Sequence, residues 1–188
     1  ATLNVPRCRL LSLEVSPLLA YDTTGTVAEA RRLRRAVDRT NLMVKVPATS
    51  QGISAIRQLT EEGFNINATL IFSQDAYEQV ANAYVAGLEA FAAKGGDIRR
   101  VASVASFFIS RIDTAIDTLI DARLETATKD ARGRAVLQGL RGKVAIASAK
   151  MAYQRSKDIF RGQRWEMLAQ RGAQTQRLLW ASTGTKNP

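Results

Sequence analysis

One lysine lies in the middle of an apolar segment, where a charged side chain is costly to place. Lys45 belongs to the run Leu42–Val46, whose other members are all apolar, as is typical of a buried strand. Burial disfavours the ammonium form, and a neutral lysine amine is a nucleophile that forms a Schiff base with a carbonyl substrate. From position alone a structural alternative stays open, in which Lys45 forms a buried ion pair with Glu14.

Three other strand-like segments place small polar or ionisable groups on one face. Because successive side chains of a strand point to opposite faces, residues two apart share a face. The same-face residues are Ser12, Glu14 and Ser16 in the first segment, Asn67 and Thr69 in the second, and Ser106 and Phe108 in the third, with Arg111 after its end. In the second segment Ile66, Ala68 and Leu70 take the opposite face. The agreement of four strands favours a convergent polar pocket and a catalytic role for Lys45.

The absence of histidine and the near absence of cysteine narrow the chemistry further. Without histidine, a Ser-His-Asp triad, a Cys-His dyad and a histidine-ligated metal site are excluded. Cys8 is the only cysteine, so no intramolecular disulfide can form, which fits a reducing cytoplasm. Catalysis must then use carboxylates, lysine, hydroxyls or backbone groups.

The formal net charge of +10 indicates anionic partners, either phosphorylated metabolites or nucleic acid. The basic residues are spread from Arg7 to Lys186, and no zinc-finger, RRM or KH pattern is present. Charge alone motivates a nucleic-acid-binding function, which is the less favoured interpretation. No apolar run approaches the roughly 18 residues of a membrane span, and the first residues lack a signal-peptide pattern. We therefore expect a cytoplasmic protein with neither nucleic-acid nor membrane partners.

Apolar, β-branched runs alternate with longer segments of helical periodicity. The predicted strands are Leu10–Val15, Leu42–Pro47, Ile66–Phe72, Val101–Ile109 and Arg177–Ser182. The predicted helices are Thr26–Arg39, Ile53–Glu62 and Gln74–Lys94, the last closed by Gly95-Gly96. From Arg111 to about Arg171 we predict several helices, broken at Arg132-Gly133, at Gly139–Gly142 and at Gly162.

This alternation predicts an α/β fold built from parallel βα units. The pattern is compatible with a doubly wound sheet and with a (β/α)8 barrel. A full barrel usually needs about 250 residues, whereas this chain has 188 residues and about five strands. We therefore expect residues 1–188 to form a single, partial domain with both ends cut off.

Five segments together resemble the transaldolase family. VKVPATSQGISAIRQL, which contains Lys45, resembles the active-site signature of these enzymes. LEVSPLLAYDT, GFNINATLIFS and SFFISRID are similar to the family segments that carry the catalytic glutamate, the Asn-x-Thr strand and the Ser-x-Phe-x-x-Arg motif. RLLWASTGTKNP resembles a late barrel strand of the bacterial subgroup that also occurs fused to glucose-6-phosphate isomerase. The resemblance runs from about Leu11 to Pro188 and implies an incomplete (β/α)8 TIM-type barrel with a helical insertion after the Ser106/Phe108 strand.

The resemblance implies a class I, Schiff-base transaldolase of the pentose phosphate pathway, a transferase of aldehyde or ketone residues. Such an enzyme transfers a dihydroxyacetone unit, converting sedoheptulose 7-phosphate and glyceraldehyde 3-phosphate into erythrose 4-phosphate and fructose 6-phosphate. The resemblance implies neither a metal nor an organic cofactor, because the covalent lysine adduct is the electron sink. The expected partners are these sugar phosphates, and the expected assembly is a monomer or a homodimer.

The family motifs also imply roles for individual residues. Lys45 attacks the ketose carbonyl, Glu14 activates a water for proton transfer, and Thr69 positions that water. The implied substrate-binding residues are Asn67, Ser106, Phe108, Arg111, Ser182 and Lys186. Among them, Arg111 offers a planar fork for the distal phosphate. Glu14 and Phe108 favour a transaldolase over the related fructose-6-phosphate aldolases, which tend to carry Gln and Tyr at these two places.

The sequence departs from complete family members at both ends. These carry an earlier strand with a catalytic aspartate and another with a Thr-Asn-Pro segment, and neither is visible here. We therefore expect a fragment that lacks N-terminal and C-terminal barrel segments and is poorly soluble or inactive by itself. A related fructose-6-phosphate-type Schiff-base aldolase and an inactive fragment remain the alternative interpretations.

Overall fold

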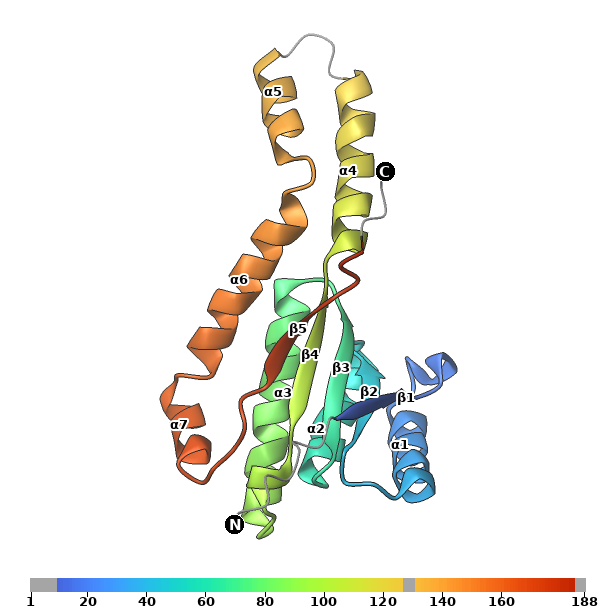
Figure 1. The fold of residues 1–188 in the computed structure, drawn as a ribbon, viewed down its shortest axis with the longest axis vertical. Coiled ribbons are helices and arrows are strands. Elements are labelled where there is room, and N and C mark those ends of the chain that lie inside the picture. The colour runs from blue at the N-terminus through green and yellow to red at the C-terminus, as the bar shows by residue number, and fades with distance from the viewer. Residues whose placement is uncertain (1–9, 127–130, 185–188) are drawn as a thin grey trace, which may run out of the picture.

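Five parallel strands form the centre of the fold (Figure 1). The computed structural model describes residues 10–126 and 131–184. The strands are β1 (Leu11–Glu14), β2 (Leu42–Pro47), β3 (Asn65–Ile71), β4 (Ser103–Phe108) and β5 (Arg177–Ala181). All neighbours pair in parallel, and each strand lies close to its predicted ends, so the predicted parallel sheet is confirmed.

A helix follows each of the first three strands. These helices are α1 (Thr23–Val37), α2 (Ser50–Glu61) and α3 (Gln74–Ala93), and two short 3-10 turns, η1 and η2, occupy Pro17–Leu19 and Ile98–Arg100. Each helix begins at a side chain that accepts a hydrogen bond from the first turn, namely Asp22 for α1, Thr49 for α2 and Ser73 for α3. Such a cap stabilises a helix by about 1 kcal/mol. The three caps therefore fix the turns at the carboxyl ends of β1, β2 and β3.

The longer connection between β4 and β5 is helical, as predicted. It contains α4 (Ser110–Thr126), α5 (Ala131–Leu140), α6 (Val144–Ile159) and α7 (Gln163–Ala169). Figure 1 shows α4 and α5 extending beyond the carboxyl ends of the strands. The Asp113 carboxylate accepts a hydrogen bond from Ala145 N at 3.0 Å, and the buried Asp117 carboxylate accepts one from Gly142 N at 3.0 Å. These two bonds tie α4 to the start of α6.

One of the three predicted helix breaks is wrong. The chain turns at residues 141–143 and at Gly162, close to two of the predicted breaks, but Arg132 and Gly133 lie inside the first turn of α5. A glycine costs a helix about 1 kcal/mol relative to alanine, which is too little to end a helix by itself.

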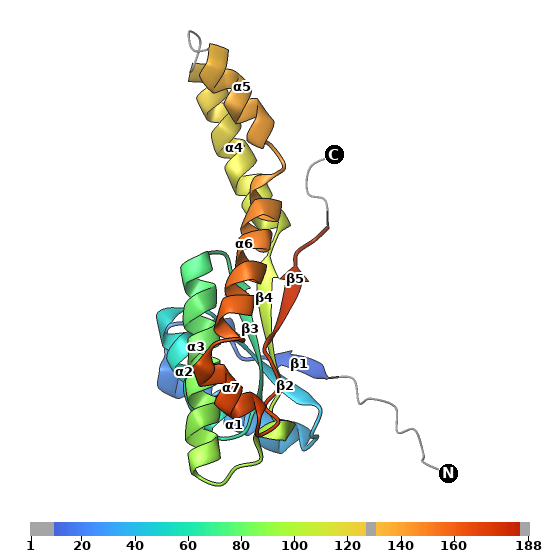
Figure 2. The ribbon, with the colours of Figure 1, turned by 90° about the vertical axis from the view of Figure 1, so that its left-hand side faces the viewer.

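The strand order separates the two architectures that the sequence leaves open. The strands follow one another in chain order across the sheet, whereas a doubly wound sheet has a point at which the order reverses. Figure 2 shows α1, α2, α3 and α6 gathered on one side of the sheet, and no helix of the described residues covers the opposite face. Sequential parallel strands with helices on one side form a sector of a (β/α)8 barrel. The predicted fold class is therefore confirmed.

The two faces of the sheet have different apolar contents. Leu42, Val44 and Val46 of β2 point toward the helices and belong to the main core, as their alternation predicts. Met43 points to the opposite face, where it forms a small cluster with Ala102 and Val104. The face opposite the helices, which we call the barrel-side face, is thus apolar near the amino ends of the strands and polar near their carboxyl ends.

A bulge in β3 changes the prediction for one residue. The pairing between β3 and β4 shifts register between Ala68 and Ile71, and Leu70 has a φ of 58°. Leu70 therefore does not join Ile66 and Ala68 in the core; it is 40% exposed and Ile71 is buried in its place. A left-handed backbone is unfavourable for a residue with a Cβ, and bulges of this kind are frequent beside active sites.

Candidate active site

Lys45 and Glu14 face each other across β1 and β2 at the carboxyl ends of these strands. They are paired in the sheet register, and Lys45 Nζ lies 3.0 Å from Glu14 Oε2. The side chains are 30% and 49% exposed, respectively, so the lysine is less buried than its apolar neighbours predict. An ion pair with this much solvent contact contributes only about 0–1 kcal/mol. The pair is therefore a weak structural element with an accessible amine.

Asn67 lies at the centre of a chain of hydrogen bonds that crosses the barrel-side face. Its Nδ2 donates to Ser12 Oγ at 3.0 Å, and its Oδ1 accepts from Ser106 Oγ at 2.8 Å. Asn67 and Ser106 are buried, and Asn67 is directly paired with Lys45 in the β2–β3 register. Because Ser12 accepts a hydrogen bond and Ser106 donates one, the two serines fix the orientation of the Asn67 amide, with Nδ2 toward β1 and Oδ1 toward β4.

The alternation of β1 predicts that Ser12 shares a face with Glu14, but it indicates no role for the residue. The available signal was its position two residues before Glu14 on a strand. What the sequence could not provide is the partner, because Ser12 and Asn67 are on strands that are not hydrogen-bonded neighbours.

Thr69 presents a buried hydroxyl to the same face. The residue is 1% exposed, and among the described residues its Oγ1 has no hydrogen-bond partner. Its backbone is fixed, because Thr69 O accepts a hydrogen bond from Ala48 N at 2.8 Å. An unpaired buried hydroxyl costs about 1–3 kcal/mol. The hydroxyl is thus positioned and available to a ligand in the cavity.

These side chains surround one cavity of about 350 Å³ at the carboxyl ends of the strands. The predicted site residues that line it are Glu14, Lys45, Asn67, Thr69, Ser106 and Phe108. Ser12, Leu179 and Ala181 complete the wall, so all five strands contribute. A volume near the small end of the usual range for ligand pockets suits a compact polar molecule. The sequence-based expectation that these polar residues converge therefore agrees with the geometry.

Arg111 lies outside this cavity and contacts its wall. It is an exposed residue in the first turn of α4, and its guanidinium carbon lies 5.1 Å from the centre of the Phe108 ring. Phe72, which was not among the predicted site residues, packs against the same ring at a centroid distance of 5.0 Å. Phe108 thus separates the polar cavity from a cationic group at its rim.

Ser182 contacts Ser110, the residue before Arg111, but does not line the cavity. Its backbone oxygen accepts from Ser110 N at 2.8 Å, and the two serine hydroxyls lie 2.9 Å apart. Ser182 has a φ of 54°, a strained conformation of a kind that clusters at ligand-binding sites. Lys186, the last predicted site residue, lies outside the described residues.

Residues 10–126 and 131–184 contain no group of three or more His, Cys, Asp or Glu side chains arranged to hold a metal ion. Within the same ranges, none of the helices combines the length and apolarity needed to cross a bilayer. Among the described residues that line the cavity, Lys45 and Glu14 are the ionisable ones.

Comparison with known proteins identifies the family. The model of the Transaldolase/Fructose-6-phosphate aldolase family matches residues 5–188. The chain belongs to this family. It is 53% identical to the transaldolase of Trichodesmium erythraeum and 52% identical to transaldolase 2 of Nostoc punctiforme, in each case over 95% of this chain and 47% of the relative. The transaldolase of Saccharopolyspora erythraea is 52% identical over 95% of this chain and 46% of its own length. The chain thus spans about half the length of the curated transaldolases it matches.

Proposed function

We propose that the protein acts as a Schiff-base transaldolase on sugar phosphates. The observation that carries this proposal is the accessible Lys45 amine in a polar cavity at the carboxyl ends of parallel strands, 3.0 Å from a carboxylate. Active sites of (β/α)8 barrels lie at this end of the strands. Membership of a family whose relatives are named transaldolases supports the same reaction.

In the proposed reaction, Lys45 Nζ adds to the carbonyl carbon of a ketose phosphate, and loss of water gives an iminium ion. The bond between the α- and β-carbons then breaks as the β-hydroxyl gives up its proton. The electron pair of that bond moves to the iminium nitrogen, leaving an enamine on Lys45 and releasing an aldose phosphate. The reverse steps on a second aldose complete the transfer.

Glu14 is suited to the proton transfers that this sequence needs. It is the only carboxylate among the described residues that line the cavity. At 3.0 Å it can accept a proton from Lys45 and so supply the neutral amine for attack. Thr69 Oγ1 is suited to hold a water between Glu14 and the substrate, because it is available as both donor and acceptor.

The remaining residues fit the binding of a hydroxylated, phosphorylated chain. Asn67 and Ser106 are proposed to bind hydroxyl groups near the carbonyl, since their hydrogen-bond chain lies beside Lys45 on the same face. Arg111 is proposed to bind the distal phosphate at the cavity rim, with Ser182 beside it. Phe108 would then hold the carbon chain between the two ends.

We further propose the broader setting that the family suggests. The reaction exchanges a dihydroxyacetone unit among sedoheptulose 7-phosphate, glyceraldehyde 3-phosphate, erythrose 4-phosphate and fructose 6-phosphate in the pentose phosphate pathway. The proposed location is the cytoplasm, and the proposed assembly is a monomer or a homodimer. Residues 1–188 are proposed to be part of a single barrel domain.

Borohydride trapping tests the central step. Incubation with fructose 6-phosphate and reduction should leave a stable adduct that peptide mass spectrometry places on Lys45. Lys45→Met should abolish it. The matched control is Lys94→Met, which removes an exposed lysine that pairs with Glu61. An adduct on another lysine would refute the site assignment.

The family also includes fructose-6-phosphate aldolases, and an acceptor separates the two activities. A transaldolase should turn over fructose 6-phosphate when erythrose 4-phosphate is present and stall at the adduct without it. Free dihydroxyacetone formed without an acceptor would instead identify an aldolase. An adduct that forms without any turnover would identify the inactive-fragment alternative.

A further inference from the structure

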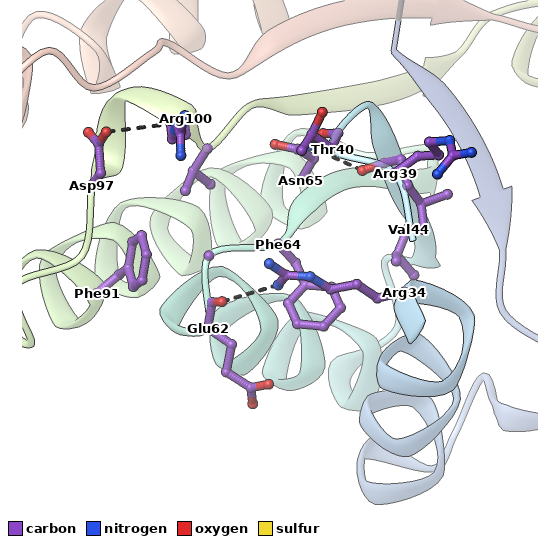
Figure 3. Close-up of a pocket in the computed structure, with 13 residues that line it drawn as sticks. Arg34, Arg39, Thr40, Val44, Glu62, Phe64, Asn65, Phe91, Asp97 and Arg100 are labelled. Atoms are coloured by element: carbon purple, nitrogen blue, oxygen red, sulfur yellow. Dashed lines mark hydrogen bonds and ion pairs between the residues drawn. The ribbon is translucent and has the colours of Figure 1, made fainter. Parts of the chain in front are cut away.

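A second, larger cavity opens at the opposite end of the strands. We call it the basal pocket; it is bounded by Arg34, Arg39, Phe64, Phe91, Arg100 and Val101 and has a volume of about 550 Å³ (Figure 3). Its residues come from the end of α1, the loops before β2, β3 and β4, and α3. The amino ends of barrel strands do not carry the chemistry of barrel enzymes, so this pocket is separate from the Lys45 site.

The basal pocket has an excess of positive charge that its own carboxylates do not cancel. Glu62 and Asp97 also line it, but each is paired with an arginine that does not. Arg31 Nε donates to Glu62 at 3.0 Å, and Arg99 donates to both oxygens of Asp97 at 2.7 and 3.1 Å. The charges of Arg34, Arg39 and Arg100, which line the pocket, are therefore only weakly compensated.

These three guanidinium groups keep most of their donors free for a ligand. Arg34 donates one long bond of 3.3 Å to the Glu62 backbone, and Arg39 donates one to Asp38 O at 2.9 Å. Arg100 is 87% exposed and reaches Asp97 only at 4.0 Å. Each guanidinium has five N–H donors in a planar fork that matches a phosphate.

The floor of the pocket is apolar and partly aromatic, which a simple anion would not require. Arg34 stacks on the Phe64 ring with its guanidinium carbon 4.4 Å from the ring centre, as Figure 3 shows. Phe91 forms another wall, and a Cβ added at Gly63 would come within 2.8 Å of its ring. Because Phe64 is itself buried under Arg34, the surface open to a nucleobase is the outer face of the Arg34 guanidinium plane.

Asn65 makes the pocket rigid by joining the loops around it. Its Nδ2 donates to Thr40 O and Leu42 O at 3.1 Å each, and its Oδ1 accepts from Ala102 N at 2.9 Å. The starts of β2, β3 and β4 are therefore held together before any ligand arrives. A preorganised site loses less conformational entropy on binding.

We propose that the basal pocket binds a nucleotide, with the phosphates on Arg39 and Arg100 and the base on the Arg34–Phe64 stack. The proposal does not depend on the reaction at Lys45, because no residue of the polar cavity takes part. It assigns a ligand class to a cavity at the end of the barrel opposite the catalytic lysine.

Isothermal titration calorimetry of the whole protein tests this assignment with three probes. ATP carries phosphates and a base, tripolyphosphate carries charge alone, and adenosine carries the base alone. ATP should bind at least about tenfold more tightly than either of the other two. Equal affinities of ATP and tripolyphosphate would overturn the proposal, because the pocket would then select charge only.

Variants locate the binding. Arg39→Gln combined with Arg100→Gln should weaken ATP binding by about tenfold or more. Arg155→Gln removes the same kind of charge on α6, outside the pocket, and should leave ATP binding unchanged. Arg111→Gln should also leave it unchanged; loss of ATP binding in this variant alone would place the nucleotide at the Lys45 cavity and overturn the proposal. Because Arg39 and Arg100 are exposed, an unchanged thermal unfolding curve is expected to exclude misfolding.

Discussion

Lys45 Nζ and Glu14 Oε2 lie 3.0 Å apart on adjacent parallel strands, and both side chains contact solvent. A pair placed for stability would be expected to be buried and surrounded by further hydrogen bonds. This pair is only half-buried, so its free energy of interaction is small and its chemistry is accessible.

Lys45→Met should therefore separate stability from chemistry. We expect the free energy of unfolding to change by less than about 1 kcal/mol, because an exposed ion pair is replaced by an apolar side chain of similar length. The borohydride adduct should disappear. Urea unfolding followed by circular dichroism measures the first quantity; a loss of several kcal/mol would favour the structural interpretation of the pair.

Ser12→Ala should act on the site through Asn67. Removal of the hydroxyl that accepts from Asn67 Nδ2 should cost about 1 kcal/mol and slow adduct formation, since the amide loses one of its two fixed partners. Ser12→Thr should restore most of the rate. The control is Ser16→Ala, because Ser16 makes only a 3.4 Å bond to Leu18 N. Equal adduct rates in Ser12→Ala and wild type would contradict the positioning role.

Thr69→Val and Thr60→Val form a matched pair of buried substitutions. Thr60 Oγ1 donates to Ile56 O at 2.8 Å, so its removal should cost about 1 kcal/mol of stability with no effect on the adduct. Thr69 Oγ1 has no partner among the described residues, so its removal should leave stability unchanged or slightly higher while adduct formation slows. A destabilised Thr69→Val with a normal adduct rate would argue against a role in the cavity.

The stability of the contact between α3 and α7 should depend on pH. Hydrogen bonds from Arg164 lower the pKa of the Glu89 carboxyl. A lowered pKa means that the stabilisation is present above the pKa of the unfolded chain, about 4.3, and is lost as the pH falls through the lower folded value. Glu89→Gln should therefore flatten the fall in urea midpoint between neutral pH and about pH 3, whereas Glu166→Gln, an exposed change on α7, should not.

The alternation of side chains correctly predicted which residues lie on the barrel-side face, because the geometry of a strand imposes this alternation. Lys45, Asn67 and Ser106 lie on one face since each occupies a regular strand of period two. Leu70 was misplaced because it lies in a bulge, which adds a residue to one strand and shifts the alternation. The residue types near Leu70 give no sequence signal for this bulge.

Helix starts were predicted less well than strands, for a reason visible in the caps. The periodicity of apolar residues begins at Thr26 and Ile53, but the helices begin earlier, next to Asp22 and Thr49. The cap precedes the first buried residue, so a boundary drawn at that residue is late.

Two features needed three-dimensional information that a single sequence does not contain. The bond between Ser12 and Asn67 joins residues that are far apart in the chain and on strands separated by β2. The basal pocket depends on Arg31 and Arg99 neutralising two carboxylates, a pairing that no local spacing defines.

The sequential strand order has a consequence for how the chain reaches this fold. β1, β2 and β3 each pair with the next strand in the chain after one intervening α-helix, so their contacts close short loops and should form quickly. β5 pairs with β4 only after the whole α4–α7 segment has been placed. Its docking closes the longest loop of the sheet, and with it Leu179 and Ala181 reach the cavity wall. The polar pocket around Lys45 should therefore be completed late in folding, after the lysine itself is in position.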